Sequence, residues 1–371
     1  MLLLFVTITM FVISMDIIFI ARPKSDYSTI EKRILEQHHI PDWKSMKTGR
    51  YQQMEQQYVS DQFPFRTAWI RIKIFLDRLE GKRESNDVFL SKHGYLIQAF
   101  PDKDDKFEEK VVSIRAFRDA HKDINFVSLI APTAISVLEK ELPKNVVTGA
   151  EIKYIDALNN QLKSDEIQTI DVLSALKEAS ESTQVYYKTD HHWTTKGAYV
   201  AFREFAHLMG ISFGEGEYKW LLVSDEFHGS LSSRSGFCAS ETDRIEIAIP
   251  KENRQFSVDN DTATNPKLYD IKKLQTDNPY DVFLGGNYGK ISINCGGENK
   301  ENLLILKDSY ANCFIPFLLG EYNKIVIVDP RYFQGDLDGI ITSESITTVV
   351  MIFNANTFAT ESSILRLLKR N

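Results

Sequence analysis

The chain has 371 residues, of which 43% are hydrophobic and 26% are charged. These proportions are typical of a protein with a packed core, and they exclude a wholly disordered chain. The formal net charge of −7 argues against nucleic acid as the main partner, because neutralising phosphates requires a basic surface.

Residues 1–21 form an almost unbroken apolar run that ends before Arg22. About twenty helical residues cross the roughly 30 Å apolar core of a bilayer, and no small-residue cleavage pattern precedes Arg22. We therefore expect one uncleaved transmembrane anchor, with a buried N-terminal helix as the alternative. The basic residues after the run favour a cytoplasmic main domain by the positive-inside rule. No basic segment precedes the run, however, and we expect the main domain to be extracytoplasmic.

Residues 22–100 separate the anchor from the main domain. Their polar, helix-periodic sequence predicts a membrane-proximal helical stalk, and residues 87–98 predict a hairpin that turns at Gly94. Residues 101–371 are expected to form the catalytic domain. Within them, residues 215–300 combine many turn residues with short β-like runs, which predicts an insertion covering one end of the sheet.

The main domain alternates apolar strands with amphipathic helices. The strands are expected at residues 124–130, 168–172, 302–306, 324–328 and 347–353. The helices are expected at residues 108–123, around 154–162 and 198–208, and from 311 to 319. Continuous apolar strands separated by helices indicate a parallel α/β sheet with helices on both faces.

Reactive side chains in such sheets collect beyond the carboxyl ends of the strands. Ser309 follows strand 302–306 at a predicted strand-to-helix turn, where backbone N–H groups can bind an oxyanion. Asp190 and His192 are two residues apart, so an extended backbone places both side chains on one face. These three residues predict a catalytic triad in which Asp190 orients His192 and His192 deprotonates Ser309. Asn354 follows the last strand and suits an oxyanion donor.

Each of these residues also has a simpler interpretation. Ser309 can be a helix N-cap, and Asn354 can be an ordinary turn residue. Asp190, His191 and His192 are residue types that bind zinc. The sequence has neither HExxH spacing nor a third histidine cluster, so we assign no metal and no cofactor. Three cysteines, Cys238, Cys295 and Cys313, leave the disulfide state open.

The run Asp190-His191-His192-Trp193 resembles the signature of the DHHW family, which is similar to the SGNH hydrolase-like domains of alginate O-acetylation proteins of the AlgX and AlgJ type. The resemblance covers most of residues 50–370. Looser markers are the runs at residues 61–66, 88–96 and 227–231. In the alginate relatives the run is Asp-x-His-Trp, which selects His192 over His191 as the base.

The resemblance also implies a circular permutation. Ordinary SGNH hydrolases place the serine block first and the acid and base last, whereas Asp190 and His192 precede Ser309 here. Rotating the chain restores the usual order and implies a flavodoxin-like sheet. The resemblance implies oxyanion or substrate roles for five further residues near the site: His191, Asn287, Tyr310, Arg331 and Tyr332.

The activity implied by the resemblance is transfer of an acetyl group, through an acetyl-serine, onto an exported polysaccharide or cell-wall glycan. The implied partner is a membrane-bound O-acyltransferase that supplies the acetyl group across the membrane. A carbohydrate acetyl esterase with the same triad is one alternative. A non-catalytic glycan-binding or assembly protein of the cell envelope is the other.

Overall fold

The computed structural model describes residues 1–28, 33–212, 214, 216–237, 241–252, 255–260, 267–296 and 301–368. The chain divides into two compact units. The first unit joins Met1–Asn86 to Ser232–Cys238, and the second joins Asp87–Leu231 to Ala239–Asn371. The division after Asn86 places the predicted hairpin in the second unit and leaves the helical stalk in the first.

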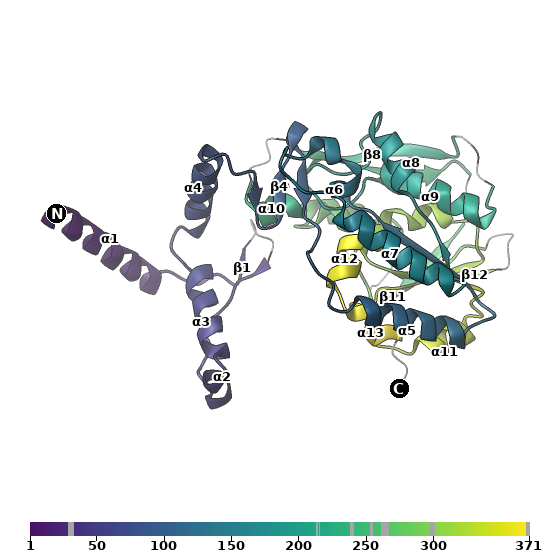
Figure 1. Ribbon diagram of the computed structural model, residues 1–371, viewed down its shortest axis with the longest axis horizontal. Coiled ribbons are helices and arrows are strands. Elements are labelled where there is room, and N and C mark those ends of the chain that lie inside the picture. The colour runs from purple at the N-terminus through teal and green to yellow at the C-terminus, as the bar shows by residue number, and fades with distance from the viewer. Residues whose placement is uncertain are drawn as a thin grey trace. The chain divides into compact units, whose positions relative to one another are not determined.

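The first unit begins with helix α1 (Leu2–Ala21), which is long and apolar enough to span a membrane and has no buried residue. Three helices follow along the stalk (Figure 1): α2 (Trp43–Lys47), α3 (Arg50–Asp61) and α4 (Arg66–Leu79). The short strands β1 (Tyr27–Ser28) and β2 (Arg33–Ile34) form an antiparallel pair. The region predicted as a stalk within residues 22–100 thus contains three separate helices, and its membrane-proximal position stays a prediction.

A seven-stranded sheet forms the centre of the second unit, with strand order β10-β11-β13-β12-β14-β6-β7. Its strands are, in chain order, β6 (Asn125–Ala131), β7 (Gln168–Thr169), β10 (Ser257–Asn260), β11 (Lys290–Asn294), β12 (Asn302–Lys307), β13 (Lys324–Val328) and β14 (Thr348–Asn354). The five strands from β13 to β7 are parallel. Counted from β12, they lie in the order 2-1-3-4-5, which is the flavodoxin-like order. A circularly permuted SGNH-like fold predicts this result, in which the usual strand order appears only when the count begins at β12.

Helices cover both faces of this sheet, and they divide the core into two layers (Figure 1). One layer contains α5 (Phe107–Ala120), α7 (Ala150–Ser164), α11 (Leu337–Ser343), α12 (Ala355–Thr360) and α13 (Ser363–Leu368). The other contains α6 (Ala134–Val137), α8 (Leu173–Ser180) and α9 (Thr195–Met209). Alternate residues of each strand face opposite layers, as Leu303 and Leu304 of β12 do. Both faces are buried, which explains the continuous apolar runs in the sequence.

The region predicted as an insertion contributes strands to the sheet itself. Strands β10 and β11 come from residues 215–300 and extend the sheet as an antiparallel edge beyond β13. The same region forms an antiparallel pair from β8 (Tyr218–Phe227) and β9 (Asp243–Pro250). Shorter elements complete it: α10 (Ser230–Ser235), η3 (Ile271–Gln275) and η4 (Pro279–Val282). A mostly parallel sheet with an antiparallel edge is common among doubly wound folds.

The predicted helix from 311 to 319 is wrong. The segment forms two short 3₁₀ helices, η5 (Ser309–Cys313) and η6 (Ile315–Leu318). Pro316 explains the break, because proline lacks the N–H that a continuing helix needs and restricts the residue before it. The turn after β12 therefore lacks a long helix whose dipole could bind an oxyanion.

The predicted hairpin is present. Strands β4 (Val88–Leu90) and β5 (Leu96–Gln98) pair antiparallel, with the 3₁₀ turn η1 (Lys92–Gly94) between them. Strand β3 (Glu84–Ser85) belongs to the first unit, and the 3₁₀ turn η2 (Glu139–Glu141) follows α6 in the second. Cys238 lies outside the described residues. Cys313 is a free, buried thiol, and Cys295 is also buried.

Candidate active site

The candidate site lies where strand order reverses, between the neighbouring strands β12 and β14. In open parallel sheets the crevice at such a point is the usual place for a ligand. Ser309 begins η5, two residues after β12 ends. The segment with Asp190 and His192 runs from the bridge residue Tyr186 to its partner Trp193. Two distant stretches of chain therefore meet at one edge of the sheet.

Ser309, His192 and Asp190 form a hydrogen-bonded series. His192 Nε2 lies 2.8 Å from Ser309 Oγ, and His192 Nδ1 lies 2.6 Å from Asp190 Oδ1. The exposed fractions are 8% for Ser309, 5% for His192 and 4% for Asp190. When Nδ1 donates its proton to Asp190, Nε2 keeps the lone pair that accepts the serine proton. This is the geometry that a serine nucleophile and its base require.

Asp190 is held in place from several directions. Its Oδ2 accepts the backbone N–H of Ser230 at 2.7 Å, and its Oδ1 accepts the backbone N–H of His192 at 3.0 Å. Burial alone would raise the pKa of Asp190. The neighbouring imidazoles of His191 and His192 and the N–H bonds outweigh burial, and the pKa lies well below its usual value. The carboxyl group is therefore an anion at neutral pH and can stabilise a protonated His192.

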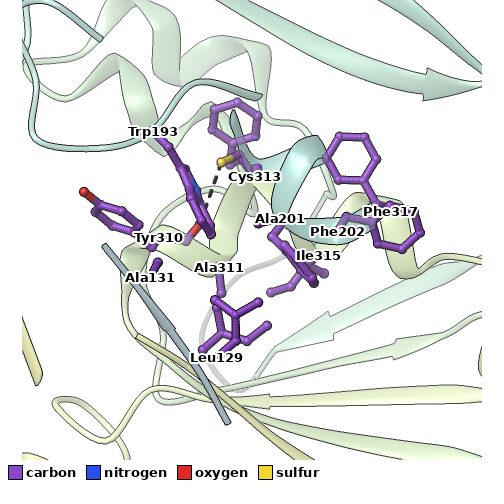
Figure 2. Close-up of a cluster of buried hydrophobic side chains, with 14 of the residues drawn as sticks. Leu129, Ala131, Trp193, Ala201, Phe202, Tyr310, Ala311, Cys313, Ile315 and Phe317 are labelled. Atoms are coloured by element: carbon purple, nitrogen blue, oxygen red, sulfur yellow. Dashed lines mark hydrogen bonds between the residues drawn. The ribbon is translucent and has the colours of Figure 1, made fainter. Parts of the chain in front are cut away.

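A buried aromatic cluster joins the Asp190 segment to the serine turn. Trp193 Nε1 donates to the carbonyl of Tyr310 at 2.9 Å, and the two rings lie 5.1 Å apart. Figure 2 shows these side chains packed together with Cys313 and, beyond it, Phe202. The Tyr310 hydroxyl in turn donates to the backbone carbonyl of His191. Trp193 and Tyr310 therefore fix the separation of the base and the nucleophile.

Asn354 does not have the free amide hydrogen that the predicted oxyanion donor requires. Its Nδ2 donates to Asp308 Oδ2 at 2.7 Å and to Thr357 Oγ1 at 2.8 Å. An amide has two such hydrogens, and both are used. Its Oδ1 caps α12 by accepting the N–H of Thr357. The prediction for Asn354 is corrected on these contacts: the residue orients Asp308 beside the serine.

Asp308 also explains why Tyr310 is a poor oxyanion donor. Asp308 Oδ1 accepts the backbone N–H of Tyr310 at 2.9 Å, and the Tyr310 side chain is fully buried. Burial raises the pKa of Asp308 to about 6, although Arg331 and the N–H bonds oppose the rise. The backbone N–H of Ser309 makes no hydrogen bond with the described part of the chain. That N–H is therefore available to bind an oxyanion at this turn.

A buried network of charges lies directly before the serine. Lys307 and Asp329 are both fully buried, and their charged atoms lie 3.5 Å apart. Lys307 Nζ also donates to the side-chain oxygens of Asn287 and Asn312, at 2.9 and 2.7 Å. Burial lowers the pKa of Lys307, and the Asp329 carboxylate opposes that fall. Asn287 thus supports this network through its oxygen and keeps its amide nitrogen for another partner.

Arg331 and Tyr332 lie at the rim of this network. The Arg331 guanidinium makes two hydrogen bonds to Asp329, at 2.9 and 2.7 Å, and is 5.4 Å from the Tyr332 ring. It is close enough to lower the pKa of Asp308. Tyr332 is 53% exposed. The exposed Tyr332 ring can contact a bound substrate, and the substrate role of both residues stays a prediction.

The His191 ring contacts the His192 ring at a tilt of 37°, with centroids 3.9 Å apart. Its Nδ1 lies 2.8 Å from Ser230 Oγ, and burial together with the neighbouring His192 lowers its pKa to about 4. Asp190, His191 and His192 bring ligand atoms within 4.8 Å of one another, a spacing that a metal ion could use. A cation there would have to displace the hydrogen bonds that His192 makes through both ring nitrogens.

Tyr280 was missed by the sequence analysis. Its ring stacks on the His192 imidazole at 3.8 Å and 10°, and its hydroxyl lies 3.3 Å from the Ser309 carbonyl oxygen. It comes from η4 in the region interpreted as an insertion. A tyrosine in an irregular segment carries no sequence pattern that would reveal this contact.

Tyr280→Leu is expected to lower kcat several-fold, up to about tenfold, because an aromatic pair contributes about 0.5–1.5 kcal/mol. Tyr280→Phe keeps the ring over His192 and should remain close to the unmodified enzyme. Steady-state hydrolysis of an acetyl ester measures both variants. Equal losses in the two variants would show that the hydroxyl, and not the stacked ring, is what matters.

Gly229 packs directly against Asp190. A Cβ at this position would be 2.2 Å from Asp190 Cβ and 2.6 Å from the Asp190 nitrogen, distances that real structures do not tolerate. Gly229→Ala is therefore expected to displace Asp190 and lower kcat by about 10²-fold or more, since small misplacements at a site cost that much. Ser230→Ala is the matched control, because it keeps the backbone N–H to Asp190. Retained activity in Gly229→Ala would contradict this packing.

Comparison with known proteins agrees with the fold. Residues 91–237 match a family model described as the SGNH hydrolase-like domain, acetyltransferase AlgX. No curated protein matches the chain. Among solved structures, a DHHW family protein from Eubacterium siraeum is similar with a TM-score of 0.65 and 21% identity, covering 77% of this chain and 98% of that one.

Two further structures are similar in fold. Bacillus cereus PatB1, solved with a sulfonyl adduct, has a TM-score of 0.63 and 18% identity, covering 76% of this chain and 99% of that one. The O-acetyltransferase domain of Pseudomonas putida AlgJ has a TM-score of 0.50 and 14% identity, covering 76% and 98%. The fold is that of an SGNH hydrolase-like domain. The resemblance to the DHHW, AlgX and AlgJ group is confirmed.

Proposed function

We propose that this protein is a membrane-anchored, extracytoplasmic O-acetyltransferase that modifies an exported polysaccharide or cell-wall glycan. The observation that carries the proposal is the series Ser309–His192–Asp190, with contacts of 2.8 and 2.6 Å at the switch point of an SGNH-like sheet. The match to an acetyltransferase family model over residues 91–237 supports the reaction class.

The first half-reaction forms an acetyl-serine. His192 Nε2 takes the proton of Ser309, and Ser309 Oγ bonds to the carbonyl carbon of an acetyl donor. The Ser309 N–H stabilises the oxyanion, a contribution of about 3 kcal/mol for one donor in comparable sites. The tetrahedral intermediate collapses when the bond to the leaving group breaks, and protonated His192 supplies the proton to that group. Asp190 stabilises the imidazolium throughout.

The second half-reaction transfers the acetyl group. His192 deprotonates a sugar hydroxyl, whose oxygen attacks the acetyl-serine and regenerates Ser309 with its proton. Arg331 and Tyr332 lie at the rim of the site, where they would contact the glycan. If water takes the place of the sugar hydroxyl, the same residues act as an acetyl esterase, so acceptor choice decides between the two activities.

Helix α1 supports a location of the reaction at the membrane. Helix α1 has a mean hydropathy of 2.5 over its most apolar window and no buried residue, properties that support a single-pass segment. With the catalytic unit on the outer side, the acetyl group has to cross the membrane before it reaches Ser309. A membrane-bound O-acyltransferase is the partner that would deliver it.

The test supplies the detergent-solubilised protein with 4-nitrophenyl acetate and a panel of neutral and acidic oligosaccharides, with mass spectrometry of the sugars as the readout. Acetylated sugar that disappears in Ser309→Ala is the expected result. Free acetate without acetylated sugar would favour the esterase. A Ser309→Ala strain with unchanged glycan acetylation, together with no donor turnover in vitro, would favour a non-catalytic binding protein.

A further inference from the structure

Helix α4 has an apolar stripe that is largely exposed within the described part of the chain. The stripe consists of five large side chains: Trp69, Ile72, Phe75, Leu76 and Leu79. Their exposed fractions run from 40% at Trp69 to 70% at Leu79. Spacings of three and four residues place them along one side of the helix. So large an exposed apolar surface marks an interaction site.

The stripe is distinct from the face by which α4 packs within its own unit. Ile74 is 7% exposed. A Cβ added to Gly236 would lie 2.6 Å from Ile74 Cδ1 and 3.3 Å from Ile70 Cγ2, so these two isoleucines face segment 232–237. Helical geometry puts Ile70 and Ile74 on the side opposite Ile72 and Leu76. The exposed stripe is therefore not a displaced part of the core.

Basic residues border the stripe on both sides. Helical geometry places Arg66 and Lys73 along one border and Arg71 and Arg78 along the other. The helix contains one acidic residue, Asp77, which is paired with Lys73 at 2.6 Å and with Lys82 at 2.9 Å. An apolar stripe between two rows of cations is the pattern of helices that lie in a membrane interface, with the long basic chains reaching the headgroups.

The stripe continues onto the membrane-spanning helix. The Trp69 ring contacts the Phe11 ring of α1 edge-on, with centroids 6.1 Å apart. A second contact, between Phe19 of α1 and Tyr58 of α3, has centroids 5.8 Å apart. Because α1 is apolar apart from Asp16 and three hydroxyl side chains, the Trp69 end of the stripe adjoins an apolar stretch of α1 at Phe11. The local cations, on a chain whose net charge is −7, match an anionic partner.

We infer that α4 lies on the surface of an anionic bilayer, with its apolar stripe among the acyl chains and its border of arginine and lysine residues on lipid phosphates. The inference rests on the proposed membrane anchor. Helix α4 would be a second membrane contact that stops the stalk from rotating freely about α1. The orientation of the stalk relative to the bilayer would then be fixed.

Nitroxide labels on the full-length protein in proteoliposomes test this. Cys238→Ser removes one native thiol, Cys295 and Cys313 are buried, and single cysteines are introduced at Ile72, Leu76, Ile13 of α1 and exposed Gln53 of α3. In vesicles of phosphatidylglycerol and phosphatidylcholine, labels at 72 and 76 should collide more with oxygen than with a water-soluble nickel chelate. The label at 53 should show the reverse.

Comparing vesicles with and without anionic lipid distinguishes binding of α4 to charged headgroups from apolar contact alone. In phosphatidylcholine alone, or in Arg71→Glu/Arg78→Glu, the oxygen preference at 72 and 76 is expected to fall several-fold, because attraction to anionic lipid is lost. An unchanged preference in both cases would overturn the anionic part of the inference.

Two other results would overturn the inference as a whole. Labels at 72 and 76 that are aqueous, with the label at 13 in lipid, would leave the anchor intact and remove α4 from the membrane. If the label at 13 were aqueous as well, the anchor itself would fail. Labels at 72 and 76 that are shielded from both reagents would mean that a protein, either a second copy or a membrane partner, covers the stripe.

Discussion

Ser309→Ala and His192→Ala are each expected to lower kcat for acetyl-ester turnover by about 10⁴-fold or more, because each removes one member of a series that acts as a unit. Ser309→Ala removes the atom that carries the acetyl group. His192→Ala leaves Ser309 Oγ without the base that lies 2.8 Å away. Donor hydrolysis under saturating substrate measures both variants.

The double variant is the critical control. Because the two residues act together, Ser309→Ala/His192→Ala should be no slower than the worse single variant. Asp190→Asn should lower kcat by about 10⁴-fold, since it favours the wrong tautomer of His192 while keeping the geometry. Multiplicative losses in the double variant, or near-normal turnover in any single one, would show that the three residues do not work as a triad.

Asp329→Ala is expected to give the largest loss of stability, about 3–5 kcal/mol, because it leaves a fully buried Lys307 without its counter-ion. It also frees the Arg331 guanidinium, which makes two hydrogen bonds to Asp329. For a unit of this size, the melting temperature should fall by an amount on the order of 10 °C. Thermal unfolding followed by circular dichroism measures the change.

Exposed Asp119 of α5 provides the comparison. Asp119→Ala should change stability by less than about 0.5 kcal/mol, as surface substitutions usually do. Asp329→Asn keeps oxygen and nitrogen atoms for hydrogen bonding but loses the charge, so its melting temperature should lie between those of the other two. An Asp329→Ala variant as stable as Asp119→Ala would mean that Lys307 finds another counter-charge or loses its proton at little cost.

The strands and the order of the chemical groups could be predicted from local sequence. Buried parallel strands leave continuous apolar runs, so β12, β13 and β14 were placed within a residue or two of their ends. The spacing of Asp190 and His192 is local as well. The prediction assumed an extended segment, whereas residues 188–192 form bends in which Asp190 Oδ1 accepts the His192 backbone N–H; this turn brings both side chains together with Ser309.

The errors came from contacts that no local pattern records. Asn354 has the residue type and strand position of an oxyanion donor, but Asp308 and Thr357 take both of its amide hydrogens. Tyr280 stacks on His192 from a short 3₁₀ helix that lies several elements further along the chain. Pro316 breaks the predicted helix, and its place in the sequence is sufficient to predict that break. The edge strands β10 and β11 are short and polar on one side, so their pairing depends on the sheet already being there.

The most direct test is to trap the covalent intermediate. The protein is mixed with a labelled acetyl donor in the absence of sugar, quenched with acid within one turnover, digested, and analysed by mass spectrometry for the position of the label. The acyl-transfer account predicts an acetyl group on the peptide that contains Ser309, absent in Ser309→Ala and slow to form in His192→Ala. Label on another residue, or donor turnover with no acetylated peptide, would contradict it.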